Sequence, residues 1–312
     1  MTIAPQEYQD RMARLQQSVA AEDLDLFIVS AEESILYLTG ISYTPLERPF
    51  FILVRPDGKP DLLVPILERD HLAQASSVQQ AHTYWDYPSP PGDGWMERLQ
   101  HLTGGVGTVG VEPTLPLEVW EAVTDLRPAV LPLVERLRLV KSPAEIEMLR
   151  HAARYADLGM ERAIRAAYHG ASLLELFGQG RAVQLQMIRE VGYDPLLSSV
   201  LVGAWPAPGS AMPHDVPSVA APLLEGPHIA LTLVRVLGYC AECERTCFVS
   251  SPNSELQAAF AAMEEARRRA FALARRGGCR GQQLPPGRGL WTVPAAPDRS
   301  WLWAQHPRRA VG

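Results

Sequence analysis

The sequence has few cysteines, few aromatic residues and no long apolar run. Its 312 residues include four cysteines and 7% aromatic residues. A membrane-spanning helix needs roughly 20 consecutive, mostly apolar residues, and no such run is present. The first 20 residues, MTIAPQEYQDRMARLQQSVA, also lack the apolar core of a secretory signal. These absences predict a cytoplasmic protein with no membrane partner, in which the cysteines stay reduced.

The sequence also lacks an excess of basic residues. Lys and Arg number 29 against 35 Asp and Glu, which gives a net charge of −6. Proteins that bind nucleic acid normally carry clusters of positive charge for phosphate contacts. We therefore expect no nucleic-acid partner. The composition, 47% hydrophobic, is that of a globular chain long enough for two domains.

The first part of the chain alternates between helical and strand-like patterns. Residues 8–21 are amphipathic. Two apolar runs, 50–54 and 62–64, flank the turn sequence Pro-Asp-Gly-Lys at 56–59, which predicts a β-hairpin. Mixed elements of this kind predict a small α/β domain over residues 1–135.

A strong helix start marks the second part of the chain. In KSPAEIEMLRHAARYADLGMERAI, Ser142 is a suitable N-cap and Pro143 occupies the first helical position. Glu145 completes a capping box, in which the Ser and Glu side chains bind each other's backbone N–H groups. Apolar residues then recur at helical spacing. A second domain is therefore predicted over residues 136–275.

Further elements are expected inside this second domain. They are helices at 175–191 and 254–275, and paired strands at 229–236 and 239–249. After them the composition changes, because 17 of the 37 residues in 276–312 are Gly, Pro or Arg and only Asp298 is acidic. No periodicity continues there, so this aberrant tail is predicted not to fold as a native element. Because GC-rich codons encode these residues, we expect the tail to arise from a frameshift or an equivalent lesion.

The stretch GYCAECERT, residues 238–246, combines cysteines and charges inside strand-like sequence. Cys240 and Cys243 form a C-x-x-C, which is typical of zinc sites and of thiol exchange. A redox pair normally opens a helix, whose dipole lowers the thiol pKa, so ordinary buried cysteines are the favoured interpretation. Glu242 and Glu244 are two residues apart and share one face of a strand. They could form an acid/base pair in which one pKa is raised, or simply a solvated strand face.

Five stretches taken together resemble the creatinase, aminopeptidase P and prolidase family. They are ESILYLTGI (33–41), LRLVKSPAEIEMLRHAARYAD (137–157), SAMPHDVPS (210–218), LLEGPHIALTL (223–233) and GYCAECERTCFV (238–249), in the family's order. The resemblance implies an α/β fold with an amino-terminal creatinase-like domain and a pita-bread catalytic domain, which is partial in this chain. It also implies a hydrolase, an Xaa-Pro dipeptidase or aminopeptidase or a creatinase-like amidinohydrolase, that forms a homodimer.

The resemblance carries an expectation about metal. Metal-dependent family members hold two divalent Mn, Co or Zn ions through two Asp, one His and two Glu. Carried onto this chain, one Asp position falls on Glu242 and the other on Leu231, which cannot ligate a metal. The His and Glu ligands belong to the half of the domain where this chain has its tail. We therefore expect no metal cofactor and a degenerate metal site.

Creatinase-type members of the family need no metal and use a His as proton shuttle and a Glu within an ERT sequence. Here Glu244 and Arg245 lie on the ERT pattern, and His214 of MPHDVP matches the His. His214 and Glu244 are thus the predicted catalytic residues and Arg245 a predicted substrate-binding residue, with a small peptide or amidine as substrate. The alternative is a non-catalytic member, a pseudoenzyme, that dimerises or binds a peptide-like ligand. A true dinuclear metallopeptidase is opposed by the ligand count.

Overall fold

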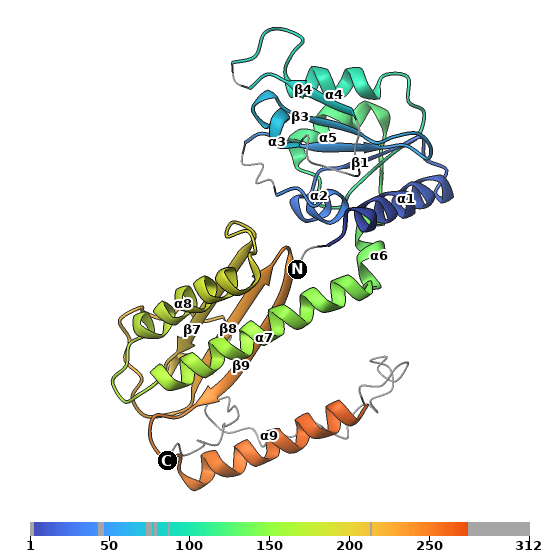
Figure 1. Ribbon diagram of the computed structural model, residues 1–312. Helices are drawn as coiled ribbons and strands as arrows, with labels where there is room; N and C mark the ends of the chain where they lie inside the picture. Colours follow the sequence, from blue (N-terminus) through green and yellow to red (C-terminus); the bar gives the residue numbers. More distant parts are fainter. Residues whose placement is uncertain are drawn as a thin grey trace. The chain divides into compact units, whose positions relative to one another are not determined.

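The computed structural model describes residues 3–42, 47–72, 77, 80–86, 88–212 and 214–273 (Figure 1). The chain divides into two compact units between Met148 and Leu149. The domain boundary that the sequence suggests, at 135/136, lies earlier and stays a prediction. The predicted tail, 276–312, lies outside the described residues.

A mixed β-sheet organises the first unit. Within the described residues its strand order is β4-β3-β2-β1-β5-β6. The strands are β1 (Leu26–Val29), β2 (Phe51–Val54), β3 (Asp61–Pro65), β4 (Gln80–Tyr84), β5 (Val109–Val111) and β6 (Ala129–Val130). β2 and β3 pair antiparallel, with Phe51 opposite Leu63, so the hairpin predicted around residues 56–59 is confirmed.

Helices cover both faces of this sheet (Figure 1). The helices of this unit are α1 (Pro5–Ala21), α2 (Glu32–Thr39), α3 (Arg69–Leu72), α4 (Trp95–Thr103), α5 (Leu117–Val123) and α6 (Leu133–Leu139), with 3₁₀ turns at Ile66–Glu68 and Thr124–Leu126. Buried residues of α1, α2 and α6 pack with Phe27 and Val29, whereas those of α4 and α5 pack with Leu26 and Ile28. Successive β1 side chains therefore enter opposite cores, as the two-residue period of a strand requires.

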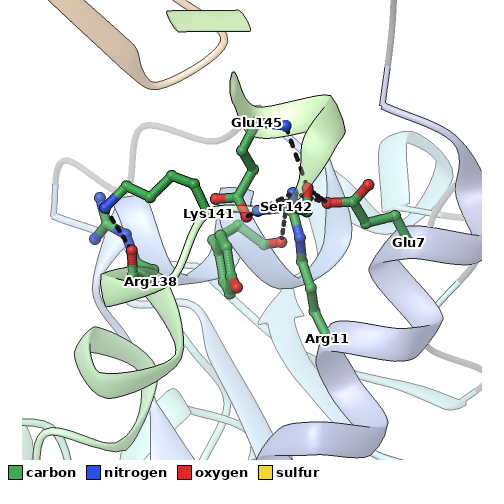
Figure 2. A network of polar contacts seen from close by, with 7 residues as sticks. Glu7, Arg11, Arg138, Lys141, Ser142 and Glu145 are labelled. Atoms are coloured by element: carbon green, nitrogen blue, oxygen red, sulfur yellow. Dashed lines mark hydrogen bonds and ion pairs between the residues drawn. The ribbon is translucent and has the colours of Figure 1, made fainter. Parts of the chain in front are cut away.

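A buried polar network joins α1 to the start of α7 (Pro143–Ala166), inside the first unit (Figure 2). The predicted capping box is present: the Ser142 N–H donates to Glu145 Oε2 at 2.9 Å, and the Glu145 N–H donates to Ser142 Oγ at 3.2 Å. Ser142 Oγ–H also donates to Glu7 Oε1, which accepts from Arg11 Nη2 at 2.7 Å as well. The capping residues of α7 are thereby hydrogen-bonded to α1.

An antiparallel three-stranded sheet organises the second unit, in the order β7-β8-β9 within the described residues. Its elements are α8 (Leu173–Val191), β7 (Ser198–Trp205), a 3₁₀ turn (Gly209–Ala211), β8 (His228–Val236), β9 (Tyr239–Cys247) and α9 (Ser254–Leu273). β8 and β9 pair as predicted and turn at Leu237-Gly238, whose φ values are 48° and 83°. Two left-handed residues are the geometry of a tight hairpin turn.

Both α7 and α8 lie on one face of this sheet (Figure 1). A Cβ added to Gly159 of α7 would meet the Thr232 side chain of β8 at a distance of 2.4 Å, so the helix approaches that strand closely. Leu173 and Leu176 of α8 pack with Ala204 of β7. Ala204 and Thr232 share a face, because Ala204 pairs with Ala230. Of the helices in the described part of the chain, none combines the length and apolarity that a membrane crossing requires.

Candidate active site

Glu242 and Glu244 lie on the sheet face that α7 and α8 do not cover. In the antiparallel register Glu244 is opposite Leu231 and Glu242 is opposite Leu233. Residues directly opposite in such a pair place their side chains on the same face. Along β8 buried and half-buried residues alternate, with Leu231 and Leu233 half-buried and Thr232 buried between them. We call the face that carries these two leucines and two glutamates the open face.

The electrostatics of the open face favour a protonatable carboxyl at Glu244. Partial desolvation raises the pKa of Glu244, and the negative charge of Glu242 raises that pKa further. Glu244 nevertheless remains solvent-exposed, so a solute can reach it. A raised pKa makes a carboxylate a stronger base, which favours general acid/base chemistry at this position.

His214 lies in the loop between β7 and β8, and its side chain is exposed. Its φ of 59° is in the left-handed region, which is uncommon for a residue other than glycine. The next residue is anchored to the open face, since the carbonyl of Asp215 accepts a 2.7 Å hydrogen bond from Trp205 Nε1. Trp205 is opposite Ile229, which is opposite Thr246. The loop is thus anchored on the open face at β7, two strands away from Glu244 on β9. No hydrogen bond joins His214 to Glu244 among the residues that the structure describes.

Arg245 points to the other face of β9. Successive strand residues alternate between faces, so Arg245 lies on the side of Cys243 rather than with Glu244. Its Nη1 donates to the main-chain carbonyl of Glu244 at 2.6 Å. This contact supports the strand backbone next to Glu244. The substrate-binding role suggested for Arg245 stays a prediction.

The C-x-x-C thiols also lie on opposite faces of β9. Cys243 is buried, and its pKa is raised by burial despite the nearby Arg245, with Asp157 of α7 raising it further. Cys240 is exposed and opposite Arg235 on the open-face side. Burial raises the pKa of Cys247 to about 11. Thiols on opposite faces cannot share one zinc ion, and raised pKa values keep thiols protonated, so this geometry favours the interpretation as ordinary reduced cysteines.

Two buried residues of β8 and β9 were not singled out by the sequence as site residues: Thr246 on the open face and His228 on the covered face. Thr246 is 2% exposed, and its Oγ1 has no hydrogen-bond partner within the described ranges. His228 is fully buried, with Nδ1 accepting from the Ala207 N–H at 3.0 Å and Nε2 within 3.2 Å of the Leu224 carbonyl. Burial lowers the pKa of His228, so this ring stays neutral and fastens both ends of the loop that carries His214. The sequence signal that could have identified His228 is its position just before the alternating pattern of residues 229–236.

The open face offers few metal ligands within the described residues. Its carboxylates are Glu242 and Glu244, and the residues opposite them are leucines, which offer no ligand atom. Among the residues described, no group of three or more His, Cys, Asp or Glu side chains could hold a metal ion. A dinuclear centre needs several oxygen or nitrogen ligands for each ion.

Comparison with known proteins identifies the architecture. Residues 11–150 match the Creatinase/Prolidase N-terminal domain, and residues 147–285 match the Metallopeptidase family M24. The putative dipeptidase YkvY of Bacillus subtilis (strain 168) is 23% identical over 278 residues, covering 80% of this chain and 68% of the relative. An Xaa-Pro dipeptidase of Lactobacillus helveticus is 24% identical over 276 residues, covering 85% and 72%.

The fold agrees with these matches. The crystal structure of a prolidase from Thermococcus sibiricus superposes with a TM-score of 0.70 at 21% identity, covering 86% of this chain and 72% of that one. The two matched domains and the shared fold define an architecture with a creatinase-like amino-terminal domain followed by a pita-bread domain of the M24 peptidase type. The chain thus carries a creatinase/prolidase-type amino-terminal domain and an M24 peptidase domain, and it is similar to prolidases and Xaa-Pro dipeptidases.

Proposed function

We propose that this chain is a hydrolase of C–N bonds in small Xaa-Pro peptides or amidines that works at the open face without a dinuclear metal centre. The observation that carries the proposal is the pairing of Glu244 with Leu231. Glu244, whose pKa is raised, lies opposite a leucine at the position where a metal-dependent relative would need a second carboxylate. The likeness to Xaa-Pro dipeptidases supports the substrate class.

The proposed mechanism uses two proton transfers. Glu244, as a carboxylate, takes a proton from a water molecule whose oxygen bonds to the carbon of the scissile C–N bond. His214 gives a proton to the departing nitrogen as the C–N bond breaks, and it recovers that proton from Glu244 through solvent. Partial desolvation and the charge of Glu242 raise the pKa of Glu244, which makes its carboxylate a stronger base.

Variant kinetics test this proposal. Glu244→Gln and His214→Ala should each lower turnover of Xaa-Pro dipeptides by roughly 10²–10⁴-fold, as expected for loss of a general acid or base. His169→Ala is the matched control, because His169 is exposed and lies before α8, away from the open face. Unchanged turnover in both site variants would overturn the assignment.

The second candidate is a non-catalytic family member that binds peptides. The missing contact between His214 and Glu244 within the described residues favours it. If the parent chain turns over neither Xaa-Pro dipeptides nor creatine, titration with the same dipeptides decides the matter. Saturable binding that is weakened by Glu244→Gln would support a peptide-binding protein. If no binding is detected, the open face is neither a catalytic site nor a peptide-binding site for these compounds.

A further inference from the structure

A cavity of about 490 Å³ lies in the first unit, whereas His214 and Glu244 belong to the second. It is lined by residues at the end of β4 and in the first turn of α4, including Trp85 and Trp95. Its volume is within the range of pockets that hold small molecules. Nothing in the proposed hydrolysis uses it.

Aromatic side chains form much of the cavity wall. Trp85 is 51% exposed, so a large part of its indole surface is open to solvent at the cavity. Trp95 packs on Phe51, with 5.9 Å between the ring centroids. Tyr84 is buried, and its hydroxyl donates to the Pro49 carbonyl at 2.9 Å. Trp95 and Tyr84 are therefore held in place, and Trp85 is available to a ligand.

The charges in the cavity are mostly negative. Glu47, Asp86 and Glu97 contribute three carboxylates against the single guanidinium of Arg48, a net charge of −2. Arg48 lies 3.4 Å from Asp86 through Nε and 3.1 Å from Glu47 through Nη2, so its charge is already shared. Glu97 is exposed and has no Lys or Arg partner in the part of the chain that the structure describes.

We propose that this cavity binds an organic cation, an ammonium or guanidinium group carried on an apolar body. The faces of indole and phenol rings attract such cations, and the carboxylates supply the matching charge. The apolar body gains from contact with Trp85, which is otherwise half exposed to water. An anion is disfavoured by the net charge. A bare metal ion is disfavoured because no three ligand side chains converge among the described residues.

Titration calorimetry with benzyltrimethylammonium tests the proposal on the full chain. We expect saturable binding, weakened roughly 3–10-fold by Trp85→Ala and roughly 2–5-fold by Glu97→Gln, in line with cation–π and surface-charge energies. Trp85→Phe should retain most of the affinity. Glu118→Gln, an exposed carboxylate on α5 outside the cavity, is the matched control and should bind like the parent.

Neutral and anionic analogues complete the test. Benzyl alcohol and benzoate should bind at least about tenfold more weakly than the cation, because they lack the positive charge. Equal binding of benzyl alcohol would overturn the cation specificity. Binding of the cation that neither Trp85→Ala nor Glu97→Gln weakens, or no binding at about 10 mM, would overturn the site. Circular dichroism of each variant confirms that the exposed substitutions leave the fold intact.

Discussion

Replacing Arg11 with methionine should destabilise the first unit far more than the loss of an ordinary surface charge. The Arg11 side chain is only 1% exposed and contacts Glu7 at 2.7 Å, with Glu145 at 3.9 Å. It also donates to the Tyr37 carbonyl at 2.9 Å and lies over the Tyr37 ring, 4.3 Å from its centroid. Methionine keeps the apolar stem but removes every one of these polar contacts.

The expected cost follows from what the substitution leaves behind. The side chains of Glu7 and Glu145 are 18% and 2% exposed, so both carboxylates would lose a cation while still largely buried. Breaking a buried ion pair by removing one partner typically costs about 3–5 kcal/mol. The exposed pair of Arg136 with Glu22 provides the comparison, since Arg136→Met should cost less than about 1 kcal/mol.

Hydrogen exchange measured by mass spectrometry can localise the effect. Peptides from α1 and the first turn of α7 should exchange roughly 10²–10⁴-fold faster in Arg11→Met, because 1.4 kcal/mol corresponds to a factor of ten. Combining Arg11→Met with Glu145→Gln should recover part of the loss, since the uncompensated charge is then removed. If Arg11→Met costs no more than Arg136→Met, the network in Figure 2 does not stabilise this unit as argued.

Three further outcomes are expected. Glu112 is 1% exposed, and burial raises its pKa. Its protonated form therefore contributes to stability below the unfolded pKa of about 4.3, and this contribution is lost as the pH rises through the folded pKa. In urea unfolding, Glu112→Gln should abolish this dependence of the unfolding free energy on pH, and an unchanged dependence would contradict the prediction. Leu237→Asn should stabilise the β8–β9 hairpin by about 1 kcal/mol, because Leu237 has a φ of 48° that asparagine tolerates better, and a lower urea midpoint would contradict this. Glu242→Gln should lower the pKa of Glu244 and move the acidic limb of the pH–rate profile to lower pH, and an unmoved limb would show that the two carboxylates are not coupled.

Local chemistry explains which parts of the fold could be predicted from the sequence. The capping box at Ser142 and the hairpin at residues 56–59 depend on neighbouring residues alone, and both are confirmed. α2 gave no helical pattern, because Ser34 to Thr39 are all buried and a helix buried all round has no polar stripe. The sequence did not predict β7 (Ser198–Trp205) either, because a glycine and small residues interrupt the alternation of apolar and polar residues along this strand.

The candidate site could be predicted only in part, because local sequence patterns do not encode contacts between residues that are distant in the sequence. The two-residue period of a strand is enough to place Glu242 and Glu244 together on one face. The anchoring of the His214 loop depends on Trp205 reaching the carbonyl of Asp215, a contact between strand and loop that no local pattern encodes. The burial of Thr246 likewise follows from packing and not from its neighbours in the sequence.

The central claim is that any hydrolysis by this chain proceeds at Glu244 without a dinuclear metal centre. The most direct measurement is turnover of an Xaa-Pro dipeptide by chelator-treated protein, with the metal content of the same sample determined by elemental analysis. We predict that turnover is unchanged by the chelator while bound Mn, Co and Zn stay well below two ions per chain. Two tightly bound ions per chain, with turnover lost on their removal and restored by Mn, would contradict it.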